Sequence, residues 1–307
     1  MLMYIVETQE LTKVYSGRAV VDRVNMHIPE GSIYGFVGEN GSGKTTIMRM
    51  LTGIARPSHG SFEMFGVKNT DPKIYRKRKE ISAIVETVSL VPTMTALDNM
   101  KYQELYLGIK LSDERRQELL TIVGLEKVGK KKVKNFSLGM RQRMGIALSL
   151  MNEPKFMLLD EPMNGLDPQG IAELRDILIK INREQHVTIL ISSHILSELE
   201  KIATVYGFIS HGKIIEELSV EELQDRCRKS TSIKFADVEE AYKVLKELYI
   251  KDFKTYPNGD VKIFDDIEDL GAFIAKLYSK KLKIMTINSS DEGVEEYYLN
   301  LVKGGNQ

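Results

Sequence analysis

Short apolar runs alternate with stretches of helical periodicity over the first two thirds of the chain. Residues 33–37, 156–159 and 187–191 are runs of mostly apolar residues, which predict buried strands. Residues 45–51 and 169–183 repeat apolar side chains every three or four positions, which predicts amphipathic helices. Because strands and helices alternate, the pattern favours an α/β fold with a largely parallel sheet and helical crossovers.

Two other kinds of segment interrupt this alternation. Residues 4–6, 20–21 and 24–28 are β-rich and are separated by turn-forming residues, which predicts an N-terminal antiparallel β subdomain. Residues 93–150 are mainly helical in pattern. Candidate helix caps are Gly53 at a C-terminus, and Asp98, Ser112 with Asp113, and Ser137 at N-termini.

The pattern changes after about residue 218. We expect a linking helix at 220–228, and a last helix at 294–302. Between them we predict a strand at 232–235, a helix at 238–248, strands at 253–256 and 261–264 around a turn at 257–259, a helix at 268–278 and a strand at 282–287. This β-α-β-β-α-β order is that of a small ferredoxin-like α+β unit. The predicted domains are therefore residues 1–218, with the helical subdomain at about 93–150, and residues 219–307, for which we expect a docking or regulatory role.

The overall composition excludes few functions but narrows the possible partners. The 307 residues include 43 basic and 43 acidic side chains, and this balance disfavours a nucleic-acid partner. The single cysteine, Cys227, rules out a disulfide within the chain. No apolar run approaches the roughly 18–20 residues that cross a bilayer, so we expect another chain to do any spanning.

A phosphate-binding loop is the first chemical motif. Residues 38–45 match G-x-x-x-x-G-K-[ST] between a predicted strand and a predicted helix, as this motif requires. Its glycines allow backbone N–H groups to turn towards phosphate oxygens, and the helix start adds a positive end. Lys44 would reach the β- and γ-phosphates, and the Thr45 hydroxyl would hold Mg²⁺. The predicted nucleotide-binding residues here are Gly38, Glu39, Asn40, Gly41, Ser42, Gly43, Lys44, Thr45 and Thr46.

Two more motifs carry chemistry further along the chain. The strand at 156–159 ends in Asp160, which is placed to hold Mg²⁺, and Glu161, which is placed to activate an attacking water. Ser137 precedes a helical stretch as a natural N-cap, and Gly139 permits close backbone approach. A helix start of this kind suits a γ-phosphate, although an ordinary N-cap explains Ser137 equally well when taken alone.

Taken in order, the motifs between Tyr15 and His194 resemble those of an ABC-type ATPase, the nucleotide-binding subunit of an ATP-binding cassette transporter. The resemblance implies a RecA-like P-loop NTPase core and ATP as the bound nucleotide. It implies a head-to-tail dimer, in which Ser137 and Gly139 of one copy face the phosphate loop of the other. It further implies that Tyr15 stacks on adenine, that Asp167 belongs to the loop 164–167 linking the two sites, and that His194 contacts the γ-phosphate.

The chain departs from the family pattern in two places. The usual signature Leu-Ser-Gly-Gly-Gln is replaced by Phe-Ser-Leu-Gly-Met at residues 136–140, and Met140 cannot hydrogen-bond as glutamine does. Glu86 stands where the family usually has a glutamine that touches Mg²⁺ and the attacking water. Glutamate keeps an acceptor oxygen, adds a charge and loses the amide donor, so the resemblance makes Glu86 a third predicted Mg²⁺ ligand beside Thr45 and Asp160. Both departures resemble the bacitracin- and lantibiotic-resistance subgroup of exporters, as does the C-terminal segment 293–301.

The resemblance implies membrane permease subunits as partners, and a peripheral position on the inner face of the cell membrane. The first hypothesis is therefore the ATPase of an exporter that confers resistance to a peptide antibiotic. A second class is a non-transport ABC ATPase of the translation or DNA-repair type. It is disfavoured because the chain has one cassette, lacks a long coiled-coil insertion and carries no net charge. A third class, a degenerate binding-only cassette, is disfavoured by the intact Lys44, Asp160, Glu161 and His194.

Overall fold

The computed structural model describes residues 3–227, 230–256, 258–265, 267, 269–290 and 294–304. These fall into two compact units, one within Met1–Val220 and the other within Glu221–Gly304, and each unit is described by itself below. Three positions in predicted elements of the second unit, Arg228, Pro257 and Glu268, lie outside the described residues, as does Gly293 at the start of the segment 293–301.

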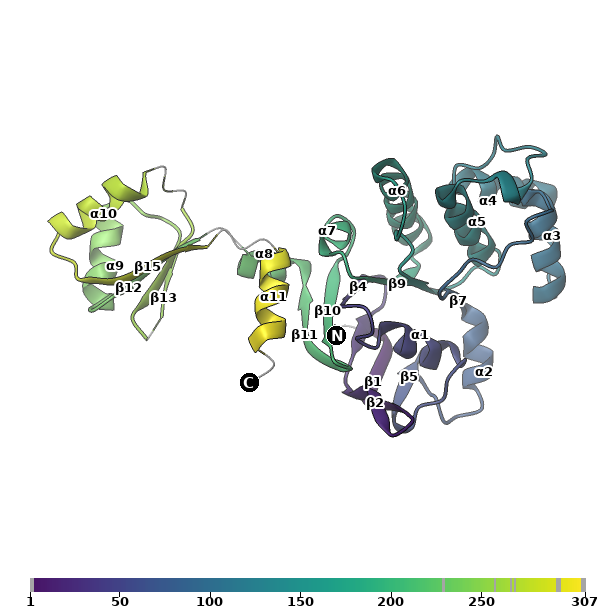
Figure 1. The fold of residues 1–307 in the computed structure, drawn as a ribbon, viewed down its shortest axis with the longest axis horizontal. Helices are drawn as coiled ribbons and strands as arrows, with labels where there is room; N and C mark the ends of the chain where they lie inside the picture. Colours follow the sequence, from purple (N-terminus) through teal and green to yellow (C-terminus); the bar gives the residue numbers. More distant parts are fainter. Residues whose placement is uncertain are drawn as a thin grey trace. The chain divides into compact units, whose positions relative to one another are not determined.

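The first unit opens with an antiparallel sheet, coloured purple and blue in Figure 1. Its strands are β1 (Tyr4–Tyr15), β2 (Arg18–Val24), β3 (His27–Pro29), β5 (His59–Met64) and β6 (Val67–Lys68). The single strand predicted at 24–28 is wrong, because β2 and β3 both pair with β1 but the ladder is interrupted between Val24 and His27. The Thr8 hydroxyl donates to the Val24 carbonyl and accepts from the Met26 N–H, both at 2.8 Å, and so bridges the break between β2 and β3.

A six-stranded sheet forms the centre of the first unit, with the order β11-β10-β4-β9-β8-β7. Its members are β4 (Ile33–Val37), β7 (Ile81–Ile84), β8 (Phe156–Asp160), β9 (Thr188–Ser193), β10 (Val205–Ser210) and β11 (Lys213–Ser219). The pairings from β10 to β7 are all parallel, which confirms the predicted parallel sheet, and β11 adds an antiparallel edge. The carboxyl ends of parallel strands share one sheet edge, where α/β folds bind their ligands.

Helices connect these strands. The phosphate loop leads into α1 (Lys44–Thr52), which ends at Gly53 as predicted, and α6 (Pro168–Gln185) and α7 (Leu196–Leu199) follow β8 and β9. Short helical turns, α2 (Ile74–Lys77) and η1 (Arg78–Glu80), precede β7. Figure 1 shows α1 between the two sheets, where its residues Ile47, Met48, Met50 and Leu51 are fully buried.

The helical subdomain contains α3 (Ala96–Leu107), α4 (Asp113–Ile122), the short η2 (Val133–Asn135) and α5 (Leu138–Leu150). Ser112 and Ser137 are N-caps as predicted. Asp98 is not an N-cap, because Thr95 takes that position and Asp98 completes a capping box from the third helical residue. Across the described residues, no helix combines the length and the apolar character needed to cross a membrane.

The second unit has a four-stranded antiparallel sheet in the order β13-β14-β12-β15. Its strands are β12 (Ser230–Phe235), β13 (Phe253–Thr255), β14 (Asp260–Ile263) and β15 (Ile284–Ser290), and its helices are α8 (Val220–Cys227), α9 (Val238–Glu247), α10 (Leu270–Ser279) and α11 (Val294–Gly304). The predicted β-α-β-β-α-β order is confirmed. Helices α9 and α10 pack on the sheet through a core that includes Ile233, Leu245, Val261 and Leu277.

Candidate functional site

The phosphate loop joins β4 to α1 and depends on its glycines. Gly41 and Gly43 have φ angles of 83° and 112°, which L side chains rarely adopt. A Cβ added to Gly38 would lie 2.5 Å from the Ile209 carbonyl oxygen, so this position has no room for a side chain. These glycines are therefore required by the backbone geometry of the loop.

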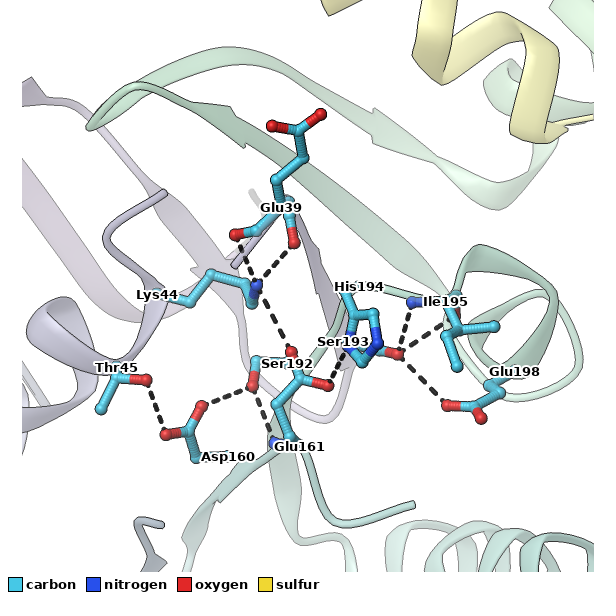
Figure 2. A network of polar contacts seen from close by, with 11 residues as sticks. Glu39, Lys44, Thr45, Asp160, Glu161, Ser192, Ser193, His194, Ile195 and Glu198 are labelled. Carbon is cyan, nitrogen blue, oxygen red and sulfur yellow. Dashed lines mark hydrogen bonds and ion pairs between the residues drawn. The ribbon is translucent and has the colours of Figure 1, made fainter. Parts of the chain in front are cut away.

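Lys44 is buried at the start of α1 and folds back over this loop. Its Nζ donates to the carbonyl oxygens of Gly38 at 2.5 Å and Glu39 at 3.1 Å, and only 5% of the side chain is exposed. The same ammonium lies 3.4 Å from Glu161 Oε1 (Figure 2). A buried cation therefore faces Glu161, the residue that directly follows β8.

Asp160 and Glu161 follow one another at the end of β8 but have different partners. Asp160 is buried and accepts hydrogen bonds from the Thr45 and Ser192 hydroxyls, both at 2.7 Å. The Glu161 N–H donates to Ser192 Oγ at 2.9 Å, and the backbone of Glu161 is left-handed with φ 48°. The two carboxylates are thereby directed to different parts of the site (Figure 2).

Glu161 links the lysine to the histidine that follows β9. Its Oε2 lies 2.8 Å from His194 Nδ1, while its Oε1 faces Lys44. Both side chains are partly accessible, at 21% for Glu161 and 31% for His194. A carboxylate held between a buried ammonium and an imidazole, at a sheet edge open to solvent, can accept a proton from a water molecule.

Sequence reasoning missed three side chains that support this arrangement. Ser192 bridges Asp160 and the Glu161 backbone, because β8 and β9 pair Asp160 with Ser192. The Ser193 hydroxyl lies 3.2 Å from the Glu198 carboxylate beside the His194 turn (Figure 2). Burial raises the pKa of Glu198, and the negative charge of Glu161 raises it further. Only the strand register, which the sequence does not reveal, identifies Ser192.

The oxygen donors needed for Mg²⁺ are present at Thr45 and Asp160, which are already in hydrogen-bond contact. Glu86, the third predicted metal residue, instead forms an ion pair with Arg49. Among the described residues, no hydrogen bond or ion pair joins Glu86 to Thr45 or Asp160. No group of three or more acidic, histidine or cysteine side chains in the described part of the chain is arranged to hold a metal. Thr45 and Asp160 therefore fit a cation that takes its remaining oxygens from a bound phosphate and water.

The signature segment lies at the start of α5. The Ser137 hydroxyl accepts from the Met140 N–H at 3.2 Å, and a Cβ added to Gly139 would meet only Leu166, at 3.7 Å. Arg141 donates to the Phe136 carbonyl at 2.6 Å. In the part of the chain that the structure describes, no hydrogen bond or ion pair joins Ser137 or Gly139 to the phosphate loop of the same copy.

Two further predicted residues occupy exposed positions. Tyr15 ends β1 with 44% of its surface exposed, and the Lys13 ammonium lies 4.9 Å from the centre of its ring. Asp167 caps α6 by accepting from the Gly170 N–H at 3.0 Å. An exposed ring and an open loop are both accessible to a ligand or to a second protein chain.

Comparison with known proteins agrees with this geometry. Residues 21–164 match the family model described as ABC transporter. The chain is 39% identical to the bacitracin transport ATP-binding protein BcrA of Enterococcus faecalis, over 98% of this chain and 97% of that protein. It is 46% identical to the lantibiotic transport ATP-binding protein SrtF of Streptococcus pyogenes, over 69% of this chain and 90% of that protein.

A solved structure shares the fold of the first unit. The ATP-binding cassette MJ0796, in a dimeric post-hydrolysis state bound to ADP and Pi, superposes with a TM-score of 0.62 at 25% identity. The alignment covers 70% of this chain and 98% of that one. With a phosphate loop, a buried lysine and paired carboxylates at one sheet edge, and with relatives matched along nearly its whole length, the chain belongs to the ATP-binding proteins of ABC transporters.

Proposed function

We propose that this chain is the ATP-hydrolysing subunit of an exporter that moves a peptide antibiotic, or a similar amphipathic compound, through separate membrane permeases. The observation that supports hydrolysis is the position of Glu161, whose carboxylate lies between Lys44 and His194. The match to a bacitracin transport protein extends over 98% of the chain, and so includes the second unit, which supports the substrate class.

The proposed roles follow from these contacts. Lys44 exchanges its carbonyl partners for phosphate oxygens, which stabilises the charge that develops during phosphoryl transfer. Glu161 accepts the proton of the attacking water, and His194 orients Glu161 through their 2.8 Å contact. Thr45 and Asp160 would hold Mg²⁺, which would supply positive charge beside the phosphates. Tyr15 offers its exposed ring to adenine.

We propose that a second copy completes each site. The N-terminus of α5, with Ser137 and Gly139, is open and unconnected to its own phosphate loop, and a helix start of this kind attracts phosphate. The related cassette MJ0796 was solved as a dimer bound to ADP and Pi. In this arrangement the loop containing Asp167 would lie at the dimer interface.

A pocket beside the helical subdomain supports docking to a permease. It measures about 330 Å³ and is lined largely by apolar residues of β7, the segment after it, α3 and α5. Beside it, α3 exposes Tyr102, Leu105 and Tyr106, by 55%, 81% and 83% of their surfaces. Exposed apolar side chains grouped on one helix are typical of a binding surface. Docking there would hold this chain on the inner face of the membrane.

The direct test combines expression with resistance. The chain and its genomically adjacent permease would be expressed in a sensitive bacterium, and the inhibitory concentrations of bacitracin and of a lantibiotic would be measured. We expect resistance to one of them with the wild-type chain and none with Glu161→Gln. If ATP is hydrolysed but neither compound is tolerated better, the peptide-export part of the proposal is wrong.

A further inference from the structure

Glu86 has a charged partner within its own chain. Its carboxylate accepts a hydrogen bond from Arg49 Nη2, and the two groups form an ion pair. Arg49 lies in the last turn of α1, the helix whose first turn carries Lys44 and Thr45. The ion pair therefore connects the phosphate-binding helix directly to the segment that follows β7.

The backbone at Glu86 is held in an unfavourable conformation. Its φ is 71°, and the Thr87 N–H donates to the Val85 carbonyl at 3.0 Å, which closes a three-residue turn centred on Glu86. Tight turns with a positive φ at a non-glycine residue are rare and strained, and persist only when surrounding contacts maintain them. The ion pair with Arg49 is such a contact.

The two sides of this ion pair differ in how firmly they are held. Helix α1 is anchored by four fully buried side chains, and 36% of Arg49 is exposed. Glu86 is 58% exposed, and the neighbouring Val85, Thr87 and Val88 line the pocket of about 330 Å³. We therefore expect loss of the pair to loosen the segment 85–89 more than α1.

We propose that Arg49 is a positioning residue that sets where the Glu86 carboxylate points, and that the ion pair is a latch between α1 and the segment 85–89. While it is closed, Glu86 is engaged at the last turn of α1 and not with Thr45 or Asp160. Glutamine at position 86 would keep the shape but lose the charge, so the latch depends on the glutamate that stands here. Any role of Glu86 after this ion pair breaks depends on the magnesium site proposed at Thr45 and Asp160.

Hydrogen exchange of the full-length, nucleotide-free protein tests the latch itself. Arg49→Met keeps the aliphatic stem and removes the charge, and Glu86→Gln removes the opposite charge. We expect each variant to speed exchange of the amides in segment 85–89 about threefold, the size typical of a partly exposed ion pair. The double variant should exchange no faster than either single one, and the reversed pair R49E/E86R should restore protection. Arg56→Met, in the exposed loop after α1, is the matched control and should leave exchange unchanged.

A second measurement addresses where Glu86 goes when it is released. Binding of a fluorescent ATP analogue would be titrated with Mg²⁺. Arg49→Met should lower the Mg²⁺ concentration for half-maximal binding about threefold, and should have no effect in the Glu86→Gln background. Equal effects of Arg49→Met in both backgrounds would overturn the positioning role. Unchanged hydrogen exchange in both single variants would overturn the latch, whereas failure of the wild-type protein to bind the analogue would instead overturn the proposed nucleotide site.

Discussion

Replacing Glu161 with glutamine should separate ATP binding from ATP hydrolysis. Glutamine keeps the shape of the side chain but cannot take a proton from water. A positioned general base typically contributes a factor of 10² to 10⁴, which corresponds to about 3–5 kcal/mol of activation free energy. We expect kcat to fall by that factor.

ATP affinity should change much less in this variant. In the nucleotide-free protein, the contacts of Lys44 with the Gly38 and Glu39 carbonyls do not involve Glu161, and neither does the contact of Thr45 with Asp160. The substitution therefore leaves both side chains in place to meet ATP. The loss of the negative charge 3.4 Å from Lys44 also leaves that ammonium more attractive to phosphate. Bound ATP should therefore persist, and dimers should accumulate.

Phosphate release and size-exclusion chromatography with ATP and Mg²⁺ measure the two outcomes. Glu184→Gln is the matched control, since Glu184 is an exposed glutamate on α6, 3.9 Å from Lys180, and should behave like the wild type. Hydrolysis at the wild-type rate by Glu161→Gln would refute the general-base role. A variant that stays monomeric with ATP bound would refute the two-copy site.

Three further predictions concern affinity and stability. Lys44→Ala should abolish ATP binding or turnover, measured by nucleotide titration and phosphate release, and full activity would contradict the proposed site. Tyr15→Ala should weaken ATP and GTP binding about equally, by roughly 1–3 kcal/mol of stacking free energy, while Tyr15→Phe keeps the affinity in the same titration. Arg116→Met should lower the free energy of unfolding in urea by about 3 kcal/mol, because it leaves Glu104 buried without the guanidinium that contacts it at 2.6 and 2.8 Å. Arg116 also lowers the pKa of Glu104. The stability that the ion pair contributes is therefore present above the ordinary glutamate pKa and is lost as the pH falls through the lowered pKa. Wild type and variant should then have similar free energies of unfolding in acid.

The parts of the site that depend on local sequence could be predicted, and the pairings between distant elements could not. The phosphate loop and the Ser137 cap are set by neighbouring residues, so their patterns are sufficient. The contacts of Glu161 with Lys44 and His194 join the start of α1 to the residues that follow β8 and β9. The parallel-sheet rule predicts the shared edge but not which atoms meet there. Arg49 was missed for the same reason, since nothing near it in the sequence indicates Glu86.

Reasoning from neighbouring residues also failed in two places. One is the start of α3, which offers two good capping residues, and the other is strand β10, which contains a glycine. Thr95 and Asp98 are both good capping residues, and the structure uses both in one capping box, so the helix starts three residues earlier than Asp98 alone suggests. Strand β10, whose sequence contains Gly207, was not predicted. That glycine is required, since a Cβ there would clash with the ring of Tyr34 on the adjacent strand β4.

The altered signature segment 136–140 keeps the backbone groups that a helix N-terminus offers to phosphate. Ser137 caps α5, and a Cβ on Gly139 would meet only Leu166, so the first turn of the helix offers its free N–H groups and its positive end. Arg141 is engaged with the Phe136 carbonyl, while the Met140 sulfur lies 3.9 Å from the Lys131 ammonium. A glutamine side chain is thus replaced by a thioether with a cation beside it. Phosphate oxygens are attracted by backbone N–H groups and by an ammonium alike. The substitution therefore replaces an amide donor with the Lys131 ammonium, and it keeps positive the surface that the second copy would meet.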